Sequence, residues 1–194
     1  MRNKPKVSVI MGIYTSKEKD MVRYAIDSIK NQTFKEWEFV ICDDGSPDDT
    51  WEFLNTEYGD DERFVLVHNE TNGGLRVALN SCLAAANADY VVRMDADDYS
   101  RPDRFDILYN YVMEHPQVDV LGTAMVSFDE NGEHGKILPR KLMPQKMDFI
   151  HGSVVAHAST IMKKSSIMAV DGYRVAWETT RCEDTDLYMR MCAN

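Results

Sequence analysis

Short apolar runs alternate with segments of helical periodicity along the N-terminal part of the chain. Val7–Ile13 is rich in β-branched residues and predicts a buried strand, whereas Met21–Asn31 places its apolar side chains on one helical face. The same alternation predicts strands at Glu38–Cys42, Phe64–Val67 and Tyr90–Met94, and helices at Asp48–Tyr58, Leu75–Ala86 and Arg104–Glu114. This order is typical of a mostly parallel sheet with helices on both faces. We therefore expect an α/β protein.

The pattern becomes less regular in the C-terminal part of the chain. We expect one more strand at Val118–Phe128, a loop or hairpin over the surface at 129–147, partly extended chain at Phe149–Met162, and helices at Ser165–Val170 and Glu183–Cys192. This portion is thus predicted to be smaller and mixed. Because the last helix has no C-capping signal, we expect the chain to be truncated at its C-terminus.

The size and charge of the chain restrict its partners. A length of 194 residues suits one domain with a single core. The formal net charge is −10, which argues against a nucleic-acid partner because binding to phosphate backbones requires a positive face. Anionic ligands would need a metal ion or a few placed arginines.

The cellular compartment is predicted from two further features. Apolar runs stay well below the roughly 18 residues of a membrane span, so we expect at most peripheral membrane contact. The four cysteines, Cys42, Cys82, Cys182 and Cys192, are scattered without metal-binding spacing. A reduced, cytoplasmic location follows, with the inner face of the membrane as a further option.

Polar clusters follow three of the predicted strands. They are CDDGSPDDT at Cys42–Thr50, HNETNGGLR at His68–Arg76, and DADD at Asp95–Asp98. Ligands of open parallel sheets bind beyond the carboxyl ends of the strands, so these clusters mark a candidate site. The first two also suit plain turns and helix caps.

The Asp-x-Asp pattern has little weight by its letters alone. Twenty aspartates predict about two matches by chance, and the chain has two, Asp95 to Asp97 and Asp184 to Asp186. The first match is distinguished by its place at a strand end, where crowded carboxylates are costly without a cation. Alternate oxygen ligands suit Mg²⁺ or Mn²⁺, which complete their coordination with water and substrate phosphates.

Six motifs occur in an order that resembles one known family. SVIMGIYTS, ICDDGSPDDT, NGGLRVALN, YVVRMDADDYSRPDRF, HAST and EDTDLYMR together resemble the family 2 glycosyltransferases, inverting enzymes of the GT-A fold that use nucleotide sugars. The tract RMDADDYSRPDRF with HPQVDVLGT is similar to bacterial members that build surface glycans. The resemblance implies a Rossmann-like GT-A domain over 1–194, with a nucleotide-binding half at about 1–115 and an acceptor-side half at about 116–194.

The resemblance also implies roles for residues of the first half. Thr15, Asp43 and Asp44 would form the nucleoside pocket, with Asp44 favoured as the contact to the base. Arg76 would lie near the nucleotide, where it pairs with a phosphate or holds Asp95.

The acidic cluster after the fourth strand receives three roles. Asp95 would face the ribose or donor sugar and share in the metal site. Asp97 would reach the metal that bridges the diphosphate, and Asp98 would be a further contact. The implied cofactor is Mn²⁺ or Mg²⁺.

The resemblance places the catalytic base at Asp184 in RCEDTDLYMR. The alternative is that Glu183 and Asp184 only complement a helix N-terminus. Glu183, His157 and Trp177 are candidate contacts to the acceptor or phosphate, although a lone histidine is often structural and Trp177 suits a cover for the core edge. Ser159 and Thr160 follow His157, and Gly172–Tyr173 resembles the turn that precedes the base.

The predicted function is the transfer of one sugar from a nucleotide-diphosphate sugar, preferably UDP-linked, to a glycan or lipid-linked acceptor. The QxxRW sequence of processive members is absent, which favours single transfer. A non-catalytic nucleotide-sugar binding module is the first alternative. A sugar nucleotidyltransferase fits less well, because GIYTSKEK lacks the expected glycine-rich loop.

Overall fold

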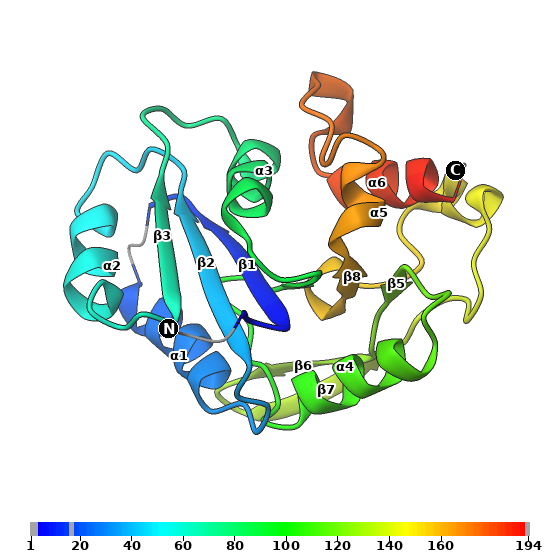
Figure 1. Cartoon of the computed structure of the whole chain (residues 1–194), viewed down its shortest axis with the longest axis horizontal. Coiled ribbons are helices and arrows are strands. Elements are labelled where there is room, and N and C mark those ends of the chain that lie inside the picture. The colour runs from blue at the N-terminus through cyan, green and yellow to red at the C-terminus, as the bar shows by residue number, and fades with distance from the viewer. Residues whose placement is uncertain (1–3, 16–17, 193–194) are drawn as a thin grey trace.

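The computed structural model describes residues 4–15 and 18–192 of the chain. Its centre is a six-stranded sheet with the order β3-β2-β1-β4-β8-β5 (Figure 1). The strands are β1 (Val7–Ile13), β2 (Trp37–Asp43), β3 (Phe64–His68), β4 (Tyr90–Arg93), β5 (Val120–Leu121) and β8 (Ile161–Lys163). The first four are parallel to one another, and β8 pairs antiparallel with both β4 and β5. The predicted α/β class with a mostly parallel sheet is confirmed.

Helices cover both faces of the sheet (Figure 1). One face carries α1 (Lys19–Lys30), α2 (Thr50–Tyr58) and α4 (Arg104–Glu114), and the other carries α3 (Leu75–Ala85), α5 (Lys164–Met168) and α6 (Glu183–Met191). The pleat of β1 divides its side chains between the layers, because Val9 and Met11 join the first core and Ile10 joins the second. Burial on both faces explains why the strands read as near-continuous apolar runs.

The predicted strand Val118–Phe128 is wrong as a single element. The chain leaves the sheet after β5 and begins a separate hairpin of β6 (Met125–Asp129) and β7 (Gly132–Ile137). Gly122 lies at the break, where a Cβ atom would approach Val155 Cγ2 to 1.9 Å. The next residue, Thr123, donates its backbone N–H to Ser159 Oγ at 3.1 Å. Contacts with a distant segment therefore turn the chain here, and a surface hairpin occupies much of the expected excursion.

The segment expected to be partly extended from Phe149 is mostly turned. It contains the 3₁₀ helices η1 (Lys146–His151) and η2 (His157–Ser159), and only its end enters the sheet as β8. A third 3₁₀ helix, η3 (Trp177–Thr179), precedes α6. Local bonds such as Thr160 N–H to His157 O at 3.1 Å satisfy the backbone in place of a ladder.

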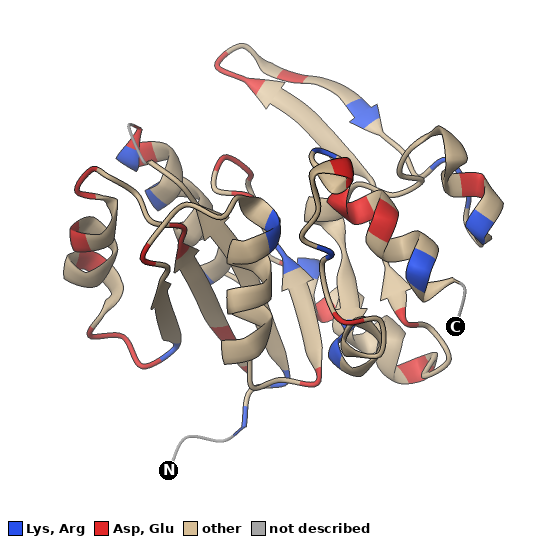
Figure 2. Cartoon of the chain, turned by 90° about the horizontal axis from the view of Figure 1, so that it is seen from above, with Lys and Arg blue, Asp and Glu red and all other residues tan. Residues whose placement is uncertain are grey.

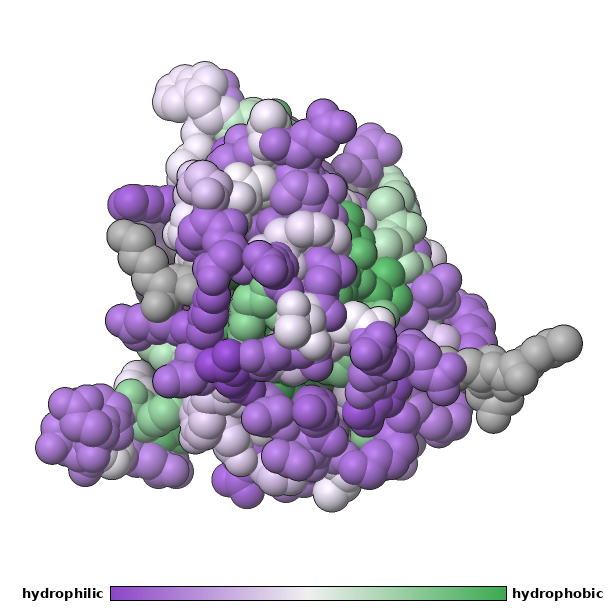
Figure 3. All heavy atoms as spheres, turned by 90° about the vertical axis from the view of Figure 1, so that its left-hand side faces the viewer, coloured by the Kyte–Doolittle hydropathy of each residue, from purple (hydrophilic) through white to green (hydrophobic). Residues whose placement is uncertain are grey.

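On the side of α2 and β3, polar side chains cover most of the hydrophobic core. That side is largely hydrophilic, with hydrophobic side chains visible in gaps (Figure 3). Within the described ranges, no helix combines the length and the apolar character needed to cross a bilayer. All four cysteines are free thiols.

Candidate active site

The carboxyl ends of four parallel strands meet at one edge of the sheet. Asp43 ends β2, His68 ends β3, Thr15 follows β1, and Asp95 follows β4. The sequence clusters predicted from the strand ends are thus neighbours along this edge. Asp and Glu residues recur in its loops (Figure 2).

Asp43 is a fully buried link between three of these strand ends. Its Oδ2 atom pairs with His68 Nδ1 at 2.8 Å, and its Oδ1 atom accepts the backbone N–H of Ser46 at 3.2 Å. Ser46 Oγ in turn accepts the backbone N–H of Thr15 at 2.9 Å. Thr15 has a left-handed φ of 51°, which this bond helps to hold. Asp43 and Thr15 therefore shape the site, and direct nucleoside contact stays a prediction for both.

Asp44 holds the loop that leads into α3. Its Oδ1 atom accepts a bond from Asn69 Nδ2 at 2.7 Å. Its Oδ2 atom accepts the backbone N–H groups of Gly73 at 3.1 Å and Gly74 at 2.6 Å. Only 2% of Asp44 is exposed. The carboxylate positions the NGG motif, and its contact with a base stays a prediction.

Gly45 makes the close approach of these loops possible, and Gly45→Ala is expected to disrupt them. Its φ is +68°, and a Cβ atom would lie 2.5 Å from Thr71 C and 2.7 Å from Asn72 N. Because both are backbone atoms, the loop must move, and we expect the free energy of unfolding to fall by more than about 2 kcal/mol. Urea unfolding measures this loss.

Gly132→Ala is the matched control for that substitution. Gly132 also has a positive φ of +115°, but nothing in the described part of the chain lies within 4 Å of the position that a Cβ atom would take. This substitution has no steric part, so its loss of stability should be smaller than that of Gly45→Ala. Equal losses at the two glycines would contradict a role for Gly45 in loop packing.

Arg93 is a functional candidate that the sequence analysis did not single out. It is 1% exposed, and its Nη2 atom lies 2.5 Å from Asp95 Oδ1. Its Nη1 atom donates to the backbone oxygen of Met94. The signal in the sequence was a lone cation inside the apolar run YVVRM. Arg93 fixes the first carboxylate of the acidic cluster.

The acidic cluster carries negative charge that its arginines only partly compensate. Burial raises the pKa of the Asp98 carboxyl, and the charges of Asp95 and Asp97 raise it further. Asp97 is exposed, whereas Asp95 and Asp98 are partly buried. Burial lowers the pKa of the nearby Arg104 to about 10, so Arg104 stays charged at neutral pH. A cation at this loop would relieve the remaining repulsion.

The carboxylates do not form a complete metal cage by themselves. Within residues 4–15 and 18–192, no group of three or more His, Cys, Asp or Glu side chains could hold a metal ion. An exposed Asp97 with few protein ligands suits an ion such as Mg²⁺ or Mn²⁺, which takes further ligands from water and phosphate. This loop could therefore supply only part of a metal site, and the remaining ligands would have to come from water or a bound phosphate.

Arg76 does not hold Asp95, so that part of its predicted role is wrong. Its Nη1 atom donates to Ala176 O at 2.7 Å, to Thr180 Oγ1 at 2.9 Å and to Thr179 Oγ1 at 3.2 Å. These residues belong to η3 and its flanks. Arg76 thus ties the start of α3 to the segment before α6.

Asp184 lies in the first turn of α6 and is partly buried. Its Oδ1 atom accepts the backbone N–H of Thr185 at 2.7 Å. Burial raises the pKa of both Tyr173 and Tyr188, and the nearby negative charge of Asp184 contributes to both shifts. Asp184 therefore lies close to two buried phenols.

The second Asp-x-Asp match separates into two different environments. Asp186 pairs with Arg174, and its Oδ2 atom lies 2.8 Å from Arg190 Nε. Its side chain is only 11% exposed. Asp186 is an ion-paired structural residue, which leaves Asp184 as the candidate of this pair.

His157 lies among the same phenols in a structural environment. Its Nε2 atom is 2.7 Å from the Tyr173 hydroxyl oxygen. Burial lowers the pKa of His157 well below its usual value, and the charge of Arg93 adds to this effect. A neutral, engaged imidazole favours the structural alternative for His157. Ser159 and Thr160 each donate a side-chain bond to nearby backbone oxygens, Ala156 O at 2.8 Å and His157 O at 2.8 Å.

Trp177 does not cover the core edge. It is 83% exposed on η3, the segment that Arg76 holds. The indole face is therefore available for stacking, and its contact with a sugar stays a prediction. Glu183 is partly buried at the start of α6, and its contact with an acceptor stays a prediction.

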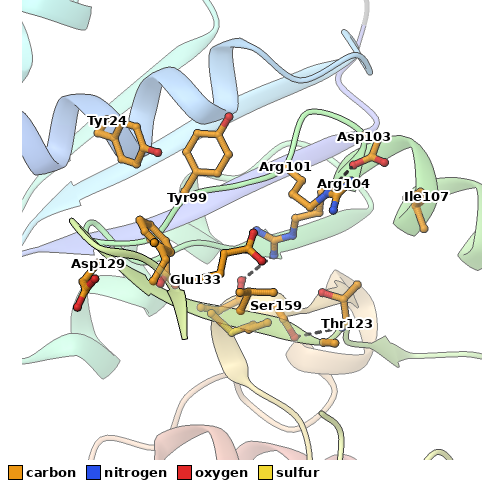
Figure 4. Close-up of a pocket in the computed structure, with 17 residues that line it drawn as sticks. Tyr24, Tyr99, Arg101, Asp103, Arg104, Ile107, Thr123, Asp129, Glu133 and Ser159 are labelled. Atoms are coloured by element: carbon orange, nitrogen blue, oxygen red, sulfur yellow. Dashed lines mark hydrogen bonds and ion pairs between the residues drawn. The ribbon is translucent and has the colours of Figure 1, made fainter. Parts of the chain in front are cut away.

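A cavity of about 660 Å³ adjoins the acidic loop on its other side. It lies between Asp98, the start of α4, Ser159 and the β6–β7 hairpin (Figure 4). Tyr24 and Tyr99 stack at its rim with ring centroids 5.0 Å apart. No sequence pattern marked this space, because its walls come from segments far apart in the chain.

Comparisons with known proteins agree with the fold and the motifs. The family described as glycosyl transferase family 2 matches residues 8–170. The chain is 38% identical over 194 residues to the putative glycosyltransferase EpsE of Bacillus subtilis, a match that covers 98% of this chain and 68% of that protein.

Two solved structures share the fold. TarS 1-349 of S. aureus in complex with UDP has a TM-score of 0.76 at 22% identity, covering 96% of this chain and 54% of that chain. The mannosyltransferase PcManGT of Pyrobaculum calidifontis, in complex with GDP-Man and Mn2+, has a TM-score of 0.71 at 18% identity, covering 97% and 52%.

The matches differ in how much of each protein they include. The chain spans about half the length of the two solved chains and 68% of EpsE. The family match ends at residue 170 and so does not include Asp184. The family match does cover most of the chain, including the four strand ends and the acidic cluster. The chain therefore belongs to glycosyl transferase family 2.

Proposed function

We propose that this chain carries out metal-dependent, inverting transfer of one sugar from a nucleotide-diphosphate sugar to a hydroxyl of a glycan or lipid-linked acceptor. The observation that carries the proposal is the under-compensated carboxylate loop Asp95–Asp98 at the edge where four strands end. A bound cation would lower the electrostatic repulsion between these carboxylates. The same cation would attract the diphosphate, which an acidic protein otherwise repels.

The donor is assigned to the half at about 1–115. Asp97 is the proposed metal ligand. Asp95 precedes it by two residues and is held by its ion pair with Arg93. When bound, Mn²⁺ or Mg²⁺ would stabilise negative charge on the departing nucleoside diphosphate. PcManGT, which shares the fold, was solved with Mn2+, and this supports the use of a divalent metal. UDP is the preferred nucleotide, as in the TarS complex, although PcManGT holds GDP-Man.

Asp184 is the proposed general base. Its Oδ1 atom is fixed by the Thr185 N–H, which orients the carboxylate on a helix rather than on a loop. The carboxylate would accept the proton of the acceptor hydroxyl as that oxygen bonds to the anomeric carbon. The bond from that carbon to the diphosphate oxygen breaks in the same step, so the configuration inverts.

The acceptor is assigned to the half at about 116–194. Arg76 supports this wall, because it holds the segment that carries Trp177 and leads into α6. The exposed Trp177 is the proposed surface for stacking a sugar ring. The four free thiols support the proposed cytoplasmic location.

A non-catalytic nucleotide-sugar binding module is the second candidate. The loops that would hold the donor are fixed by Asp44 and Arg93 and make no contact with Asp184 in the described part of the chain, so such a module could dispense with Asp184. Such a module would bind donor and metal and release no nucleotide. The two candidates therefore differ in turnover and agree in binding.

A panel of nucleotide sugars tested by thermal unfolding, with and without Mn²⁺, is the first experiment. We expect one donor class to raise the Tm only when metal is present. That donor is then incubated with glycan acceptors, and release of the nucleoside diphosphate is measured. Stabilisation that ignores metal for every donor would contradict the metal site, and binding without release would favour the module.

A further inference from the structure

One short segment is positively charged, although the chain as a whole is acidic. Residues 136–147, KILPRKLMPQKM, contain four cations, Lys136, Arg140, Lys141 and Lys146, and no Asp or Glu. The whole chain has a formal net charge of −10. We refer to residues 136–147 as the basic segment. It forms the end of β7, the loop after it and the start of η1, at the margin coloured yellow in Figure 1.

The basic segment is also unusually apolar at its surface. Five of its large side chains are strongly exposed: Ile137 51%, Leu138 64%, Leu142 90%, Met143 83% and Met147 70%. Single exposed apolar residues are ordinary, but a run of them marks an interaction site. The four cations are interspersed with these residues along the chain, so both chemistries occur in the same short, exposed segment.

The exposure of the basic segment is fixed by contacts beneath it. Phe149 of η1 is 3% exposed, and its ring lies 5.9 Å from that of Tyr188 on α6. Arg140 donates its backbone N–H to Val154 O at 2.9 Å and its Nη1 to His151 O at 3.0 Å. Leu142 and Met143 are therefore held outward by an anchored loop.

The acidic groups nearby leave most of the positive charge available. Asp148 lies 2.8 Å from Lys141 and neutralises that cation. Asp129, Glu130 and Glu133 lie at or near the hairpin turn, at the opposite end of β7 from Ile137. Figure 2 shows this separation, with red at the turn and blue toward the other end of β7. The cations Lys136, Arg140 and Lys146 remain without a carboxylate ion pair among the described residues.

We propose that the basic segment docks on an anionic lipid surface. Leu142 and Met143 enter the interface between headgroups and acyl chains, and Lys136, Arg140 and Lys146 contact the headgroup phosphates. The charge favours this occupant, because a cluster of cations beside apolar side chains is the pattern that binds acidic bilayers. The rest of the acidic surface would be repelled, so docking has one orientation. The proposal goes beyond the transfer reaction and does not depend on it.

Sedimentation with lipid vesicles tests the proposal on the 194-residue chain. We expect binding to vesicles of phosphatidylcholine with phosphatidylglycerol, weakening as salt is raised, and little binding to phosphatidylcholine alone. Lys136→Gln with Lys146→Gln should weaken binding by roughly 25-fold, about fivefold for each cation. Leu142→Ser with Met143→Ser should weaken it by at least about tenfold.

Matched variants elsewhere on the surface control for charge and apolarity. Lys4→Gln with Lys30→Gln removes the same charge from side chains that are 62% and 39% exposed. Met113→Ser with Met168→Ser removes two methionines that are 53% and 50% exposed. Both controls should bind vesicles as the parent chain does.

The proposal fails if the parent chain does not sediment with anionic vesicles, or if the control pairs weaken binding as much as the segment variants. Equal binding to neutral and anionic vesicles would also overturn it, because the cations would then contribute nothing to the affinity for the bilayer. A circular dichroism spectrum of each variant confirms that the fold is kept. Absence of vesicle binding would leave donor binding and transfer unaffected, so the two proposals fail separately.

Discussion

Asp184→Asn is expected to lower kcat for sugar transfer by about 10²- to 10⁴-fold, the usual contribution of a general base. The amide keeps the size of the side chain but cannot accept the hydroxyl proton. The donor site is assigned to other residues, so the affinity for nucleotide should change little. Release of the nucleoside diphosphate measures the first effect, and calorimetric titration with the nucleotide measures the second.

The structural alternative for Asp184 predicts a different outcome. If the carboxylate only complements the N-terminus of α6, its loss costs about 0.3–1 kcal/mol of stability and leaves kcat intact. Glu114→Gln makes the same chemical change at an exposed position at the end of α4, outside the proposed site, and should leave both quantities unchanged. Full turnover in Asp184→Asn would remove this residue from the mechanism.

Asp97→Asn is expected to abolish the part of nucleotide affinity that depends on Mn²⁺. Asp97 is exposed and is the proposed metal ligand, so the amide removes the charge that holds the cation. We expect the Kd for the nucleoside diphosphate to rise by at least about tenfold, close to the value for the parent chain treated with EDTA, because charge-assisted contacts to phosphate are lost. Titrations with and without EDTA measure both values.

Asp60→Asn is the control for that experiment, since Asp60 is an exposed carboxylate after α2, outside the loops at the strand ends. It should keep the full response to Mn²⁺. If Asp97→Asn retains a metal response equal to that of the parent chain, the metal lies elsewhere. Asp95 would then be the next residue to replace, although the loss of its bond to Arg93 would confuse the result.

The sheet could be predicted well because its strands are buried on both faces. Val7–Ile13 is apolar at nearly every position, so its boundaries were correct, and those of Arg104–Glu114 agree because its helical periodicity is strong. The strand ends could also be predicted, since parallel strands bring their carboxyl ends to one edge. That topology placed Asp43 and Asp95 at the same edge before any contact was known.

The partners of the site residues could not be predicted in the same way. Arg76 and Ala176 are 100 residues apart in sequence, and Arg93 lies two residues from its partner Asp95. No local sequence pattern tells whether an arginine pairs with a distant or a neighbouring residue. The reason is that its long side chain binds whichever acceptor the fold brings near. The break at Gly122 is of the same kind, since Val155 and Ser159 decide it from across the fold.

The sequence by itself determined the alternation of strands and helices, the edge at which polar residues gather, and the family motifs. These follow from periodicity and from short-range chemistry, which are local properties of the chain. Only the tertiary structure decided that Asp44 holds the NGG loop, that Asp186 pairs with two arginines, and that the basic segment faces outward. Those outcomes depend on which distant groups compete for each side chain, and that competition exists only once the chain is folded.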